Sequence, residues 1–70
     1  MKLIRRKIFC YVYDPFTLKR RLNELADEYD QVGCTIRWGS GGSLQVSLPD
    51  REIHYVPGEG CIKELVFKED

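Results

Sequence analysis

Seventy residues provide for one domain, and a chain this short buries only about 60% of the surface that its unfolded state exposes. The core therefore needs most of the apolar residues, which make up 43% of the sequence. A homodimer that shares its core would increase the buried apolar surface, so dimerisation is a possibility that the sequence leaves open. Eleven Lys and Arg balance eleven Asp and Glu, so the formal net charge is zero. Neutrality argues against a dedicated nucleic-acid binder, a class that is usually basic.

The balance hides an uneven distribution of charge along the chain. Residues 1–21 carry a net charge of +6 and residues 22–70 a net charge of −6. The molecule is therefore expected to be a dipole if the fold keeps the two parts apart. Internal ion pairing is the alternative.

No segment predicts a membrane span or a cofactor site. The apolar runs are far shorter than the roughly 20 residues that cross a bilayer, and residues 1–7 lack the apolar core of a secretory signal, so we expect a cytoplasmic protein without membrane contact. Cys10, Cys34 and Cys61 are odd in number and widely separated, which predicts reduced thiols. With His54 they could supply four zinc ligands, but no Cys-x-x-Cys pair is present, and we expect neither a metal nor another cofactor.

Residues 3–13 predict the first β-strand, because they are dense in β-forming and aromatic residues. Strict alternation places on one face Ile4, Ile8, Cys10 and Val12. The opposite face combines cations with aromatic rings: Leu3, Arg5, Lys7, Phe9, Tyr11 and Tyr13. Both faces are apolar, so alternation alone does not show which one a helix covers.

The pair Asp14-Pro15 predicts the start of a helix that continues to about residue 32. A carboxylate caps free N–H groups, and proline at the first helical position lacks only a donor that would have had no partner. The apolar residues recur at helical spacing and form one stripe: Leu18, Leu22, Leu25, Tyr29 and Val32. Gly33 follows as the left-handed exit residue.

The remaining residues predict short strands separated by turns. The expected strands cover residues 34–38, 44–48, 53–56 and 61–67, and the segment Gly39–Ser43 is expected to close a hairpin. The order is therefore β-α-β-β-β-β. We predict an α+β fold in which a single helix packs on a four- to five-stranded, mainly antiparallel sheet, with residues 1–70 forming one domain.

Nothing in the sequence predicts catalysis. The one histidine, His54, has no nucleophile that the sequence places beside it. The glycines of residues 39–43 join two strands and do not run into a helix N-terminus, which phosphate-cradling loops require. We therefore expect a protein that is not an enzyme.

The basic and aromatic face of the first strand is the strongest positive signal. Cations that meet phosphates beside rings that stack on bases are typical of sheet-surface RNA binders. Alternatively the helix covers this face, and the aromatic residues belong to the core. Protein binding explains more, because a single helix covers only one of two apolar faces, and because Tyr, Trp and Arg dominate interface hot spots. We predict a binding surface drawn from Arg5, Lys7, Phe9, Tyr11, Tyr13, Arg20, Arg21, Trp38 and Tyr55.

The expected function is that of a small non-enzymatic protein-binding module. Such domains occur among phage and mobile-element accessory proteins that inhibit or modulate a host protein. The expected partner is a host protein or a second copy of the chain, and a strand edge offers a means of pairing in both cases. The alternative is a single-stranded nucleic-acid or RNA-binding protein that uses the basic and aromatic first strand.

Overall fold

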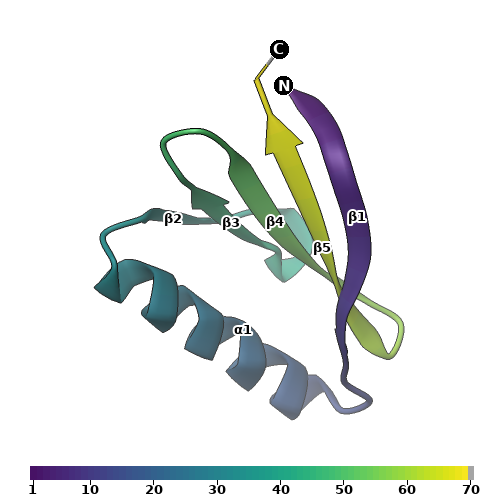
Figure 1. Cartoon of the computed structure of the whole chain (residues 1–70). Coiled ribbons are helices and arrows are strands. Elements are labelled where there is room, and N and C mark those ends of the chain that lie inside the picture. Colours follow the sequence, from purple (N-terminus) through teal and green to yellow (C-terminus); the bar gives the residue numbers. More distant parts are fainter. Residues whose placement is uncertain (70) are drawn as a thin grey trace.

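The computed structural model describes residues 1–69 and consists of one helix packed on a five-stranded antiparallel sheet (Figure 1). The predicted α+β class and element order are confirmed. The elements in chain order are β1 (Lys2–Tyr11), α1 (Pro15–Gln31), β2 (Thr35–Trp38), the 3-10 turn η1 (Ser40–Gly42), β3 (Leu44–Ser47), β4 (Glu52–Gly58) and β5 (Cys61–Lys68). The strand order across the sheet is β1-β5-β4-β3-β2, so β1 and β2 form the two outer edges.

Helix α1 begins where the sequence predicts it. The carboxylate of Asp14 accepts hydrogen bonds from the backbone N–H of Phe16 at 3.2 Å and of Thr17 at 2.9 Å, and from the Thr17 hydroxyl. The hydroxyl and N–H of Thr17, with the N–H of Phe16, lower the pKa of Asp14 because they stabilise its charged form. Pro15 occupies the first turn. The helix ends at Gln31, and Gly33 at φ 86° then turns the chain toward β2.

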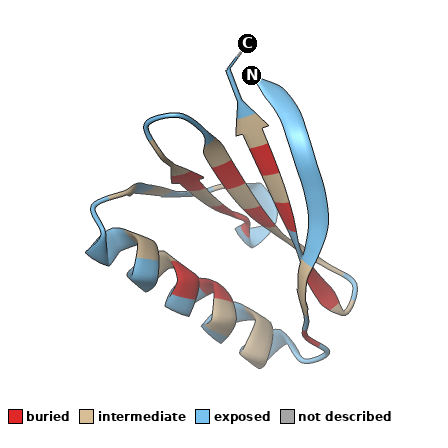
Figure 2. Ribbon diagram, viewed as in Figure 1, coloured by how far each residue is buried: buried red, intermediate tan, exposed pale blue. Residues whose placement is uncertain are grey.

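The core lies between α1 and the middle of the sheet, as Figure 2 shows by the buried segments on α1, β3, β4 and β5. Leu22 and Leu25 are the buried residues of the helix. They share a cluster with one side chain after β1 and with alternate side chains of the three inner strands: Val12, Leu44, Val46, Ile53, Tyr55, Ile62 and Val66. One face of the sheet is therefore covered by the helix, and the other, which we call the open face, is not.

The glycine-rich segment closes the β2–β3 hairpin, as predicted. The N–H of Gly39 donates to the Ser43 carbonyl at 2.8 Å, and the chain reverses through the 3-10 turn η1. Gly41 and Gly42 have φ values of 71° and 81°, a conformation that glycine adopts without the steric cost of a side chain.

Two β-bulges in β1 alter its predicted faces. The pairing of β1 with β5 shifts between Leu3 and Arg5 and again between Ile8 and Cys10. Phe9 and Cys10 therefore both pack against the core, whereas strict alternation placed them on opposite faces. Ile4 was expected on the same face as Cys10 but is exposed. The prediction of two alternating faces for this strand was thus wrong, because each bulge adds a residue and changes the alternation.

Within residues 1–69, no helix combines the length and apolar character that a membrane crossing requires. All three cysteines are free thiols, half-buried at Cys10 and Cys34 and buried at Cys61.

Candidate binding surface

Strand β1 is an outer edge of the sheet and the most exposed strand of the protein. It spans ten residues and, within the described part of the chain, pairs only with β5. Ile4 and Ile8 keep 52% and 45% of their surface exposed, and Leu3 is exposed beside them. The pale blue of β1 in Figure 2, beside the red of the inner strands, shows this contrast. An exposed edge with apolar side chains is a site at which another chain can pair.

The two bulges leave one regular stretch in the middle of β1. Residues Arg5, Arg6, Lys7 and Ile8 pair one to one with the segment from Val66 back to Lys63. Side chains that pair across an antiparallel ladder lie on the same face of a sheet. Three consecutive cations therefore occupy the part of the edge where pairing is regular.

Arg5 and Lys7 lie on the helix-covered face. Lys7 pairs with Glu64, and Glu64 in turn pairs with the core residue Tyr55. Arg6 and Ile8 pair with Leu65 and Lys63 on the open face. The basic run thus divides between the two faces of the sheet.

Glu64 is a buried carboxylate outside the predicted set of site residues. Only 5% of its surface is exposed, and its Oε1 lies 3.0 Å from the Arg5 guanidinium and 3.8 Å from the Lys7 ammonium. A buried charge is tolerated when it is paired, so these two cations stabilise Glu64 and are held by it. The signal was present in the sequence, since Glu64 stands between Ile62 and Val66 at the period-two spacing of one strand face.

Tyr55 was predicted to lie on the binding surface, and the structure places it in the core with 2% of its surface exposed. Its hydroxyl lies 2.8 Å from that of Tyr29 on α1. Burial raises the pKa of Tyr55 strongly, and the neighbouring Tyr29 hydroxyl and Glu64 carboxylate add to the rise. The sheet register turns Tyr55 toward the helix and into the core, so the prediction that it lies on the surface was wrong.

Phe9 is held by its neighbours and does not present a free ring. It packs edge-on against Tyr55 with the ring centroids 5.1 Å apart, and the Arg21 guanidinium lies 5.3 Å from its centroid. The cation of Arg21 over this ring is a cation–π contact. Phe9 and Arg21, both predicted surface residues, therefore contact each other, and Phe9 also contacts the core residue Tyr55.

The other predicted residues lie in separate places. Tyr11 and Tyr13 are exposed at the end of β1, where Val12 N–H donates to the Gly60 carbonyl at 3.0 Å. Arg20 is exposed on α1. Trp38 is exposed on β2, at the opposite edge of the sheet from β1. The predicted residues therefore do not form one continuous surface.

Most cations of the basic N-terminal part are not neutralised within the described chain. Among residues 1–69, ion pairs join Arg5 and Lys7 to Glu64, and the remaining ion pairs involve Arg37, Arg51 and His54. The basic residues without an ion pair in that range are Lys2, Arg6, Lys19, Arg20, Arg21, Lys63 and Lys68. Positive charge is thus available to a partner along β1 and α1.

His54 lies on the open face, paired with Gln45 and Leu65. Its Nε2 is 3.0 Å from the Glu52 carboxylate, and its ring centroid is 4.7 Å from that of Phe67. Across the described residues, no three His, Cys, Asp or Glu side chains come together as metal ligands.

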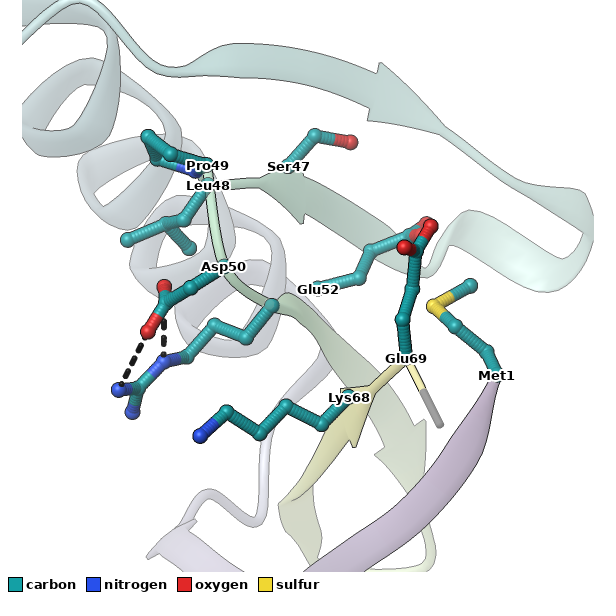
Figure 3. Close-up of a pocket in the computed structure, with 9 residues that line it drawn as sticks. Met1, Ser47, Leu48, Pro49, Asp50, Glu52, Lys68 and Glu69 are labelled. Atoms are coloured by element: carbon teal, nitrogen blue, oxygen red, sulfur yellow. Dashed lines mark hydrogen bonds and ion pairs between the residues drawn. The ribbon is translucent and has the colours of Figure 1, made fainter.

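Two grooves lie outside the regular stretch of β1. At the β3–β4 turn, a polar groove of about 220 Å³ is lined by side chains that include Asp50, Glu52 and Lys68 (Figure 3). Arg51 lies 3.1 Å from Asp50 there, and this contact lowers the pKa of Asp50. A mainly apolar groove of about 350 Å³ lies between α1 and the η1 turn, with Leu18 and Trp38 in its walls.

Comparison of the chain with protein-family models, curated proteins and solved structures finds no match.

Proposed function

We propose that the chain is a non-enzymatic protein-binding module that engages its partner through β1. The observation that carries the proposal is the combination, on one outer strand, of an open backbone edge and the exposed side chains of Leu3, Ile4 and Ile8. An edge strand presents N–H and C=O groups that have no partner in the sheet, and a second chain satisfies them by adding a strand. Apolar side chains beside such an edge gain from burial in the same complex.

The alternative, single-stranded nucleic-acid binding, relies on an uninterrupted basic and aromatic stripe. Bases stack on exposed rings. Here Phe9 packs on Tyr55 beneath Arg21, and Arg5 and Lys7 both contact Glu64, so part of that stripe is engaged inside the protein. Tyr11 and Lys7 remain exposed. Protein binding is therefore the function that the geometry favours.

An inhibitor of a host protein, the role expected for a phage or mobile-element accessory protein, would act through the same edge. Its surface would need no pocket, since strand addition takes affinity from main-chain hydrogen bonds and specificity from alternate side chains.

Site-specific photocrosslinking in the cells that encode the protein tests the proposal. A benzophenone amino acid replaces Ile8 in the full chain, and the matched control replaces Val32, an exposed apolar residue just beyond α1. We expect a discrete protein adduct from position 8 that is absent from position 32. Identical adducts from both positions, or adducts with nucleic acid, would contradict the proposed function.

A further inference from the structure

Building on that function, we propose that the partner presents an extended acidic segment that adds to β1 as a sixth strand of the sheet. The charges along the regular stretch of β1 carry this inference. Arg5, Arg6 and Lys7 are consecutive, and Arg6 makes no ion pair with any residue of 1–69. An added strand would place its side chains directly beside these cations.

A basic groove on the sheet adds to the same charge pattern. It has a volume of about 260 Å³ and is lined by Arg6, Lys7, Ile8 and Lys63. Among residues 1–69, its lining holds three cations and no carboxylate. Because charges of one sign in a groove raise the local concentration of the opposite sign, this part of the edge favours an acidic partner.

The same charges disfavour a second copy of the chain at this edge. If two β1 strands paired antiparallel about a twofold axis through the regular stretch, the Arg5–Lys7 run of one copy would face the same run of the other. Like charges directly opposite each other across a ladder are destabilising. Self-pairing through β1 would therefore bring cations together with no acid between them.

The bulges define the pattern of the partner. Regular pairing is available from Arg5 to Ile8, and the pairing shifts on either side of this stretch. Arg6 shares the open face with Ile8, and Arg5 and Lys7 share the covered face, so acids are required on both faces of the added strand. The fitting sequence has consecutive carboxylates beside Arg5, Arg6 and Lys7, with a β-branched apolar residue beside Ile8.

The two faces of the stretch differ in how much charge they leave free. On the covered face Glu64 compensates one of the two cations that contact it, and on the open face Arg6 and Lys63 have no such acid among residues 1–69. Arg6 is therefore the principal contact for a carboxylate of the partner. Because Arg6 is exposed and outside the core, we expect its substitution to leave the fold intact.

The test uses the peptide acetyl-Thr-Val-Glu-Glu-Glu-Val-Thr-amide, whose palindromic sequence fits β1 in either strand direction. We expect it to bind the full chain and to slow amide hydrogen exchange within Arg5–Ile8. Arg6→Glu is expected to weaken binding about tenfold, because it reverses the charge at the principal contact. The control Arg20→Glu makes the same change of net charge on the exposed side of α1 and is expected to weaken binding by no more than about twofold.

Two further probes separate strand addition from other modes of binding. The backbone N–H groups of an extended peptide point alternately to its two edges, and only the edge that pairs with β1 donates hydrogen bonds to it. Methylation of the nitrogens on that edge is expected to abolish binding, and methylation of the nitrogens on the opposite edge is expected to leave binding intact. Equal effects of Arg6→Glu and Arg20→Glu, or binding without protection of Arg5–Ile8, would overturn the inference.

Other occupants of the edge give distinct results. An oligouridylate that binds more tightly than the peptide, with affinity that falls steeply as salt rises, identifies nucleic acid as the occupant and overturns the inference. A dimer observed by sedimentation also overturns the inference if Arg6→Glu either abolishes or strengthens that dimer. If the peptide fails while the crosslink from position 8 still captures one protein, the acidic strand is wrong and the protein-binding function stands.

Discussion

The contact between Arg5 and Glu64 makes a quantitative prediction about stability. Glu64 is a carboxylate in the core layer, and Arg5 is the nearest cation to it, at 3.0 Å. We consider three variants, Arg5→Gln, Glu64→Gln and the double variant, which together form a double-mutant cycle. Glutamine removes the charge at both positions; it has the shape of glutamate at position 64 and is shorter than arginine at position 5.

The distance sets the scale of the expected coupling. Coulomb's law at 3.0 Å gives about 1.4 kcal/mol in water and about 5.5 kcal/mol at an effective dielectric constant of 20. The Arg5 side chain is 57% exposed, so solvent screening moves the value toward the lower limit. Lys7 remains 3.8 Å from the carboxylate when Arg5 is neutralised. We therefore expect a coupling free energy of about 1.5 kcal/mol between Arg5 and Glu64.

Urea unfolding at neutral pH and moderate salt measures the cycle. Arg5→Gln is expected to lower the free energy of unfolding by about 1.5 kcal/mol in the parent and by close to zero when Glu64 is already Gln. Arg20→Gln, an exposed cation on α1, is the control and should show no such dependence on residue 64. A coupling below about 0.3 kcal/mol would refute the view that Glu64 holds Arg5 in place.

Three further predictions concern the core, the tyrosine pair and the helix cap. Ile62→Ala is expected to lower the free energy of unfolding by about 2–5 kcal/mol because Ile62 is fully buried, whereas Ile4→Ala should lower it by less than about 1 kcal/mol. Urea unfolding measures both losses, and equal losses would contradict the core assignment. The pKa of Tyr55 is raised above 10.0, so its neutral form stabilises the fold and that contribution is lost as pH rises above 10. The Tyr55→Phe variant should therefore lose less stability between pH 9 and 11 than the parent, and an equal loss in both proteins would contradict this prediction. The pKa of Asp14 is lowered from 3.8, so its contribution is present above that pH and is lost as pH falls; thermal melts should separate Asp14→Ala from the parent at pH 7 and not at pH 2, and an equal separation at both would exclude the charged cap as the cause.

The helix and the turns were predictable because their signals are local. Asp14-Pro15 specifies a capped start, the apolar stripe specifies which side of α1 is buried, and Gly33 specifies the exit, all within a few residues of where they act. The predicted helix end at about residue 32 differs from the observed end at Gln31 by one residue. These segments could be predicted without knowledge of tertiary contacts.

The candidate surface was predictable only in part, because its geometry depends on pairing between the ends of the chain. Arg5 and Glu64 are 59 positions apart in the sequence, and only the β1–β5 pairing places them in contact. The positions of the two bulges also depend on that pairing, and they decide that Phe9 is partly buried while Ile8 stays exposed. Alternation identified the strand and its cations but left open which residues face a partner.

Arg6 is a second residue whose surroundings could not be predicted from the sequence alone. Its neighbours at period two are Ile4 and Ile8, so alternation alone would place Arg6 on an apolar face of the strand. In the folded protein it pairs with Leu65 on the open face, beside Lys63, which is 57 positions away along the chain. Its role as a contact for acidic groups therefore comes from the sheet order, with β5 returning beside β1.

The most direct test of the central claim is amide hydrogen exchange of the full chain with and without the partner captured from position 8. Amides of β1 that point away from β5 have no strand to pair with among the described residues, so they should exchange fast in the free protein and slowly in the complex. We predict that protection gained on binding is concentrated in Lys2–Tyr11. Protection confined to the opposite edge around Trp38, or to the groove between α1 and the η1 turn, would contradict the assignment of β1 as the binding edge.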